Sequence, residues 1–271
     1  WKEWENLPQG SKEFYEFKNS DPEISRALSE VYDGDIIRKA CNYIDAQKEY
    51  FGATILEVGC ESGYMTGFLA KAFPDSKIVS IDRSQAAIKV AKHRIESMDL
   101  HNVEFLTASL DEIQGQFDTI FCMRTIQENL SHENIPFMGE PLFFQFFEYG
   151  ESTDKYTQML VSRLKEDGKL CVFERIDHDP LICGWMMELC NLKCAPDLST
   201  YSEVRCEEGR TQSTFQAFIS KNHTIENPYE MIQLWFAAIK VDTSGKTPLT
   251  GWKALTYLEV NAGQLIRGVR I

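Results

Sequence analysis

Two glycines and two carboxylates have the types and spacing of a ligand-binding loop. The apolar run 55–58 contains Glu57 and is followed by Gly59 and Gly63, four residues apart. Glycine adopts positive φ angles and lets a ligand approach the main chain closely. About nineteen residues after Gly63, a second apolar run ends in Asp82, whose carboxylate can accept hydrogen bonds from two ribose hydroxyls. The pattern predicts a site for a nucleoside-containing ligand at the ends of two neighbouring strands.

The order of these residues argues against a dinucleotide. Dinucleotide folds use G-x-G-x-x-G, because a pyrophosphate lies on the N-terminus of the following helix. Here the order is E-x-G-x-x-x-G, and the carboxylate of Glu57 would repel a pyrophosphate but could suit an ammonium group. A ligand with an adenosine at one end and an amino acid at the other fits both Glu57 and Asp82. The alternative, a strand-turn-helix without a ligand, does not account for Asp82.

At these residues the chain resembles the class I S-adenosylmethionine-dependent methyltransferases, whose first motif is hydrophobic-E/D-x-G-x-G-x-G. The resemblance covers roughly residues 36–221 and departs at Glu61, which stands where the family usually has its middle glycine. It implies S-adenosyl-L-methionine as the cofactor and S-adenosyl-L-homocysteine as the product. It also implies that Ser109 and Leu110 meet the edge and the face of the adenine ring, although Ser109 could equally cap a helix.

The cofactor prediction therefore rests on several short segments. The predicted cofactor-binding residues are Glu57, Gly59, Cys60, Gly63, Asp82, Arg83, Ser109, Leu110 and Met123. A branched side chain at Gly59 is expected to fill the space that the methionine moiety needs.

The acceptor side is less defined. Methyl transfer from a sulfonium requires alignment and exclusion of water, and a base is needed only where the acceptor is not already a competent nucleophile. The candidates at the ends of the fourth and fifth strands are Glu128, His132 and Glu174. Histidine titrates near neutral pH, but a lone loop histidine is more often simply exposed. The insertion 130–157 carries an aromatic run at 142–147, which could line an acceptor pocket or form a satellite cluster under a long loop.

Metal binding is not predicted. Asp177, His178 and Asp179 are adjacent on an irregular segment without a third ligand region, which favours solvated loop charges. The eight cysteines lack paired C-x-x-C spacing, and Cys122 lies inside a strand as a core thiol. This usage favours reduced, buried thiols in a cytoplasmic protein.

The elements that position these residues alternate between strands and helices. We expect an α/β fold: a doubly wound, seven-stranded, mostly parallel sheet with a terminal antiparallel hairpin and helices on both faces. Before the first strand, Asp21 should cap a helix with Ile24, Leu28 and Val31 on its buried face. Further along, 165–168 should form a turn before the fifth strand. The expected division is an N-terminal helical and aromatic segment (1–35), a methyltransferase domain (36–221) and a C-terminal extension (222–271).

Charge limits the partners. The formal net charge is −13 and the pI is near 4.9, which disfavours a phosphate backbone as substrate. No apolar run approaches the roughly 20 residues of a membrane helix. The leading hypothesis is therefore a cytoplasmic methyltransferase acting on a small molecule. Alternatives are a protein methyltransferase, and a non-catalytic cofactor-binding subunit supported by Glu61 and the C-terminal extension, which could also mediate a homodimer.

Overall fold

The computed structural model of the chain describes its residues in several ranges. These are 12–129, 155–175, 192–197, 199–207 and 211–222, with 185, 189, 240–241 and 249–250. His132, the aromatic run 142–147, the segment 177–179 and most of the C-terminal extension lie outside them. The proposed division at 35/36 and 221/222 stays a prediction.

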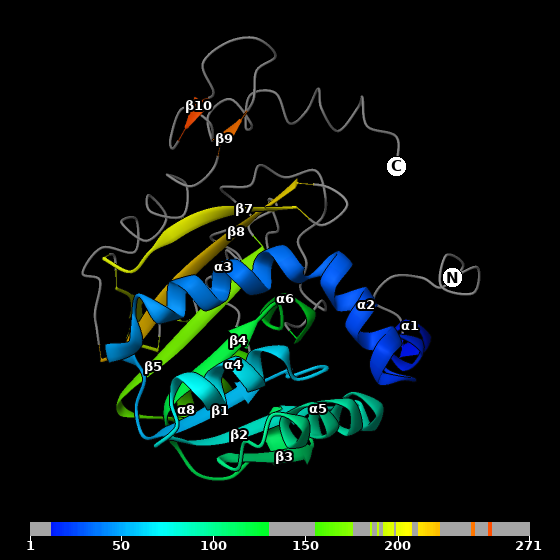
Figure 1. Cartoon of the computed structure of the whole chain (residues 1–271). Helices are drawn as coiled ribbons and strands as arrows, with labels where there is room; N and C mark the ends of the chain where they lie inside the picture. Colours follow the sequence, from blue (N-terminus) through cyan, green and yellow to red (C-terminus); the bar gives the residue numbers. More distant parts are fainter. Residues whose placement is uncertain are drawn as a thin grey trace.

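The core of the protein is one mixed β-sheet with the order β3-β2-β1-β4-β5-β8, followed by β6 and β7 along the outer edge of β8. Figure 1 shows the strands stacked from β3 at the bottom of the view to β7 at the top. The strands are β1 Thr54–Val58, β2 Lys77–Asp82, β3 Val103–Thr107, β4 Phe117–Met123, β5 Leu164–Arg175, β6 Cys194–Pro196, β7 Ser202–Glu207 and β8 Thr211–Lys221. The first five are parallel to one another, and β8 runs antiparallel to β5.

This topology confirms the expected doubly wound sheet with a terminal hairpin. β7 and β8 form the hairpin, with Ser202 paired to Gln216. The short strand β6 was not expected, and it pairs with the last residues of β8. Because β6 and β7 pair with different parts of the same edge of β8, the eight strands of the sheet fill seven positions across it. A separate antiparallel pair is formed by β9 (Lys240–Val241) and β10 (Leu249–Thr250).

Helices precede the sheet and connect its strands. They are α1 Lys12–Lys18, α2 Pro22–Tyr32, α3 Gly34–Asp45, α4 Tyr64–Ala72, α5 Gln85–Ser97, α6 Ile126–Asn129 and α8 Lys155–Ser162, with short 3-10 turns η2 Lys48–Tyr50 and η3 Leu110–Glu112. The Asp21 carboxylate caps α2 by accepting hydrogen bonds from the N–H groups of Glu23 and Ile24, and Ser84 caps α5 in the same way. Among the described residues, no helix is long and apolar enough to cross a membrane.

Alternating strand residues build two cores, one on each face of the sheet. Leu56, Ile120 and Val172 face the side covered by η3 and α8, where Leu110 and Leu160 are buried. Burying a side chain of this size stabilises the fold by about 2 kcal/mol. The residues that face α3 and α4 on the opposite side include Ile55, Ile78, Phe121, Cys171, Phe173 and Phe218. Among the described residues, both faces of the sheet are thus packed against helices.

Two local expectations were only partly right. Leu28 of α2 is buried as expected, but Val31 is 63% exposed, and Ser25 and Ser29 share the buried face. The expected turn 165–168 lies inside β5, where the pairing with β4 shifts register between Phe117 and Thr119. A Cβ on Gly168 would lie 3.0 Å from the backbone of Lys165, so the chain does fold back tightly there, but as an irregularity of the strand.

Candidate functional site

The glycine loop follows β1 and is held by the end of β2. The N–H groups of Gly59 and Cys60 both donate to the carbonyl of Ile81, at 2.9 and 3.0 Å. Gly59 and Gly63 have φ angles of +75° and +79°, which glycine adopts without steric cost. The loop therefore keeps its shape through main-chain hydrogen bonds and the two glycines.

Packing gives these glycines a second role. A Cβ at Gly59 would lie 2.3 Å from Cγ2 of Thr125, and one at Gly63 would lie 2.8 Å from Cβ of Ala91. The space beside Gly59 is thus taken by the segment after β4. We expected a side chain there to fill the space of the methionine moiety, whereas its first contact is with Thr125.

Asp82, at the end of β2, organises the loop and the next helix. Its Oδ2 accepts a hydrogen bond from the N–H of Glu61 at 2.9 Å, and its Oδ1 accepts one from the N–H of Ser84 at 2.8 Å. Both oxygens of the carboxylate thus accept main-chain hydrogen bonds, and an ionised carboxylate has further lone pairs that can accept from a ligand hydroxyl. Asp82 is partly exposed, and burial raises its pKa above the usual value. These features fit the ribose of an adenosyl ligand.

Glu57 lies deeper. It is 1% exposed, and its Oε2 accepts hydrogen bonds from the hydroxyls of Thr66 at 2.5 Å and Ser80 at 2.7 Å. Burial raises the pKa of Glu57 to about 7, although both hydroxyls oppose this shift. The carboxylate ties β1 to α4 and β2 beneath the loop. Its predicted contact with an ammonium group stays a prediction.

The segment after β3 lies beside a cavity of about 310 Å³. The N–H of Ser109 donates to the carboxylate of Glu112 at 2.8 Å, which forms part of a capping box, while Leu110 is 4% exposed. The cavity is lined by Arg83, Ser109, Leu110, Asp111, Asn129, Lys155, Tyr156 and Met159. Three predicted contacts, Arg83, Ser109 and Leu110, are therefore brought together.

Five other lining residues, one of them Asp111 beside Leu110, were missed as site residues. Lys155, Tyr156 and Met159 belong to α8; the first two fall inside the expected insertion 130–157, and Met159 falls in the ordinary helix expected after it. Asn129 is the last residue of α6 and follows the candidate base Glu128. A helix pattern does not indicate which end of the sheet its residues reach.

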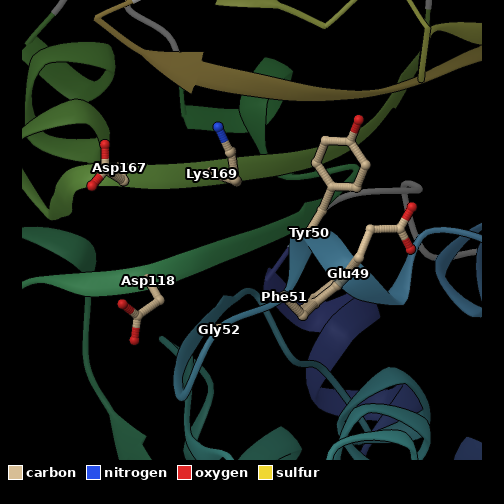
Figure 2. A pocket seen from close by; sticks show the side chains of 7 residues that line it. All are labelled: Glu49, Tyr50, Phe51, Gly52, Asp118, Asp167 and Lys169. Atoms are coloured by element: carbon tan, nitrogen blue, oxygen red, sulfur yellow. The ribbon is translucent and has the colours of Figure 1, made fainter.

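A larger cavity of about 400 Å³ lies at the other end of the strands, beside the amino end of β4. Figure 2 shows Tyr50 and Phe51 on one side and Asp118 and Lys169 on the neighbouring strands. In parallel α/β sheets ligands bind beyond the carboxyl ends of the strands. The predicted residues Arg83, Ser109 and Leu110 line the smaller cavity, and none of the predicted cofactor-binding residues lines this one.

The predicted acceptor-side residues have different environments. Glu128 is exposed and accepts a hydrogen bond from the hydroxyl of Tyr15 at 3.2 Å. Glu174 is 1% exposed, and its Oε2 accepts a hydrogen bond from the N–H of Ile126 at 2.9 Å. Met123 is partly buried and packs on the core beneath α3 and α4, whereas Cys60 is buried behind the loop. Glu174 thus supports the start of α6, and the role of a base stays a prediction for all three candidates.

Glu61 is the departure from the family motif, and it has a φ angle of +45°. Its carboxylate forms an ion pair with Lys18 of α1. The loop is therefore in contact with the N-terminal helices. Among the described residues, no cluster of three or more potential metal ligands is present.

Comparison with known proteins agrees with this geometry. The family described as a methyltransferase domain matches residues 51–258, which is most of the chain. The chain belongs to this family, and its sheet is that of the class I, S-adenosylmethionine-dependent methyltransferases. The match includes the glycine loop, Asp82 and the whole sheet.

Individual relatives match over shorter stretches. A malonyl-[acyl-carrier protein] O-methyltransferase of Priestia megaterium is 35% identical over 75 residues, covering 27% of this chain and 26% of that protein. A ubiquinone biosynthesis O-methyltransferase of Pseudomonas paraeruginosa is 30% identical over 96 residues, covering 34% and 40%. The chain thus matches between a quarter and two-fifths of these relatives' length.

Among solved structures, similarity is more distant. The magnesium protoporphyrin IX methyltransferase of Synechocystis PCC 6803 with bound S-adenosylmethionine has a TM-score of 0.46 and 14% identity, covering 79% of this chain and 86% of that one. A methyltransferase structure from Thermoplasma acidophilum has a TM-score of 0.45 and 14% identity, covering 63% and 68%.

Proposed function

We propose that the chain is an S-adenosylmethionine-dependent methyltransferase that acts on a small molecule by in-line transfer. The proposal is carried by the way Asp82 lies between the glycine loop and the segment containing Ser109 and Leu110. These groups end three neighbouring strands, β1, β2 and β3, which matches the length of an adenosyl ligand with an amino acid at one end. Membership of the methyltransferase family adds independent support.

Each residue has a defined task in this proposal. The partly exposed carboxylate of Asp82 would accept hydrogen bonds from the ribose hydroxyls, and Leu110 would lie against the adenine ring. Gly59 and Gly63 keep the loop in the left-handed conformation that such an approach requires. Bound S-adenosylmethionine would supply a methyl group already activated on sulfur, so the remaining task of the protein is alignment and exclusion of water.

The acceptor is proposed from charge and from the relatives. A net charge of −13 disfavours nucleic acid. Both curated relatives are named as O-methyltransferases, which favours testing oxygen acceptors first. A protein acceptor with basic side chains is the alternative within the same chemistry.

One observation favours a non-catalytic class. Glu61 replaces a motif glycine, and its carboxylate forms an ion pair with Lys18. A regulatory subunit that binds the cofactor without catalysis could tolerate this replacement. Turnover separates the two classes. We expect release of S-adenosylhomocysteine when the chain is incubated with S-adenosylmethionine and a panel of small hydroxyl and carboxyl compounds. Tight cofactor binding without turnover across the panel would favour the subunit, and absence of binding would contradict both.

A further inference from the structure

Glu61 occupies a backbone conformation that side chains other than glycine seldom adopt. Its φ angle is +45°, and it lies between two glycines that also have positive φ. A glycine would adopt this conformation with less strain. The glutamate therefore needs a compensating interaction, and its contacts identify one.

Its partner is Lys18, the last residue of α1. Lys18 is 5% exposed, forms an ion pair with the Glu61 carboxylate and lies 2.8 Å from Oδ2 of Asp33. Burial alone would lower the pKa of Lys18, but the two carboxylates outweigh it and raise the pKa. The ammonium group is therefore charged, and both of its carboxylate contacts are needed to offset its removal from water.

The ion pair between Lys18 and Glu61 is connected to the proposed cofactor site through the backbone of Glu61. The N–H of Glu61 is the group that donates to Asp82, so Lys18 fixes the side chain of the residue whose peptide orients the proposed ribose ligand. Asp33 extends the network to the end of β4, where its Oδ1 lies 3.6 Å from Nη1 of Arg124. A single buried lysine thus connects the glycine loop with the segment after β4.

Other contacts join the same two parts of the molecule. The hydroxyls of Ser29 and Ser62 are 3.4 Å apart, and the Tyr64 hydroxyl lies 3.5 Å from the carbonyl of Arg26. Figure 1 shows α1 and α2 beside the ends of α5 and α6. We use "cap" for residues 12–33. The buried Ser29 of α2 contacts the loop at Ser62, so the cap meets the loop through polar groups, with Lys18–Glu61 as an oppositely charged pair.

We propose that Lys18 and Glu61 are a positioning pair that holds the cap against the glycine loop and fixes the Glu61 peptide for cofactor binding. The pair acts on affinity for the cofactor and not on the chemical step, because neither side chain is placed at a reacting atom. The cofactor part of this inference rests on the proposed function. The contact between the cap and the loop does not depend on it.

The decisive variant is Glu61→Gly, which restores the family residue and removes the strain of the positive φ. If the pair positions the loop, Glu61→Gly should bind S-adenosylhomocysteine about tenfold more weakly and raise the KM for S-adenosylmethionine, with kcat changed less than twofold. Lys18→Met should weaken binding of S-adenosylhomocysteine to a similar extent, whereas Lys18→Arg, which keeps the positive charge, should retain most of the wild-type affinity. Asp99→Gly is the matched control, since Asp99 has a φ of +54° but lies exposed after α5.

Hydrogen exchange of the ligand-free protein tests the same pair without the cofactor. Amides of the cap should exchange at least tenfold faster in Glu61→Gly than in the wild type, whereas Asp99→Gly should leave them unchanged. Equal affinity together with equal cap exchange in Glu61→Gly would overturn the proposal. If the wild type fails to bind either cofactor form, the proposed function fails, and the exchange result alone decides whether the pair holds the cap.

Discussion

The N–H of Glu61 donates a hydrogen bond of 2.9 Å to the carboxylate of Asp82, which joins the glycine loop to the end of β2. The same carboxylate accepts a hydrogen bond from Ser84 at the start of α5. Asp82 thus fixes the two chain segments on either side of the proposed ribose position before any ligand arrives. Such preorganisation lowers the entropy that binding must offset.

The first prediction concerns Glu57, whose pKa burial raises to about 7 from an ordinary value of 4.5. The folded state binds this proton more tightly than the unfolded state. The associated stability is therefore full below pH 4.5 and is lost as the pH rises to about 7. The loss corresponds to about 3 kcal/mol. Glu57→Gln, which cannot ionise and can still accept both hydroxyl hydrogen bonds, should gain stability relative to the wild type by about that amount between pH 4.5 and 7.5.

Urea unfolding at several pH values measures this difference. Glu104→Gln, an exposed carboxylate on β3, is the control and should follow the wild type throughout. Parallel pH profiles for Glu57→Gln and the wild type would show that the carboxyl is not held in its protonated form.

The second prediction concerns the contact between Gly59 and Thr125. In Gly59→Ala, the new Cβ would meet Cγ2 of Thr125, so both backbone strain and overpacking should destabilise the protein, together by roughly 2–4 kcal/mol. Thr125→Ser removes that methyl group. The double variant should recover the packing part and keep a strain of about 1 kcal/mol. A double-mutant cycle on unfolding free energies measures the coupling. Additive effects would mean that the two residues are not in contact.

The third prediction concerns the cysteines. Burial raises the pKa of Cys122 to about 12, and Cys60 and Cys171 are also buried. Since the thiolate is the reactive species, native protein treated with iodoacetamide at pH 8 should leave these three unmodified. Peptide mass spectrometry reads out each site. Full labelling in urea is the positive control, and rapid native labelling of Cys122 would contradict its position in the sheet.

Much of the central sheet could be predicted because its signals are local. The strands from β1 to β4 are short apolar runs, and the glycine loop and Asp82 mark where two of them end. The partners of Lys18 could not be predicted, because Glu61 and Asp33 are distant in sequence and a lysine on a helix is usually solvated. The same reason applies to the burial of Ser29, whose hydroxyl lies 3.4 Å from that of Ser62, thirty-three residues further along the chain.

Two further features of the sheet were missed for a different reason. β6 is a three-residue strand that ends in Pro196, and proline normally argues against a strand, but here the strand lies at the sheet edge. In β5, the residues from Lys165 to Gly168 fold back tightly, but pairing with β4 resumes at Lys169, and the Lys165 ammonium group contacts Asp118 on β4 at 2.9 Å. Both outcomes depend on tertiary contacts.

The central claim is that an adenosyl ligand binds at the loop organised by Asp82. Calorimetric titration of S-adenosylhomocysteine into the wild type, Asp82→Ala and the control Asp99→Ala tests it most directly. We expect one ligand per chain, with affinity reduced roughly 10- to 100-fold in Asp82→Ala, about 1.4–3 kcal/mol, and unchanged in Asp99→Ala. No binding to the wild type, or equal affinity in Asp82→Ala, would contradict the account.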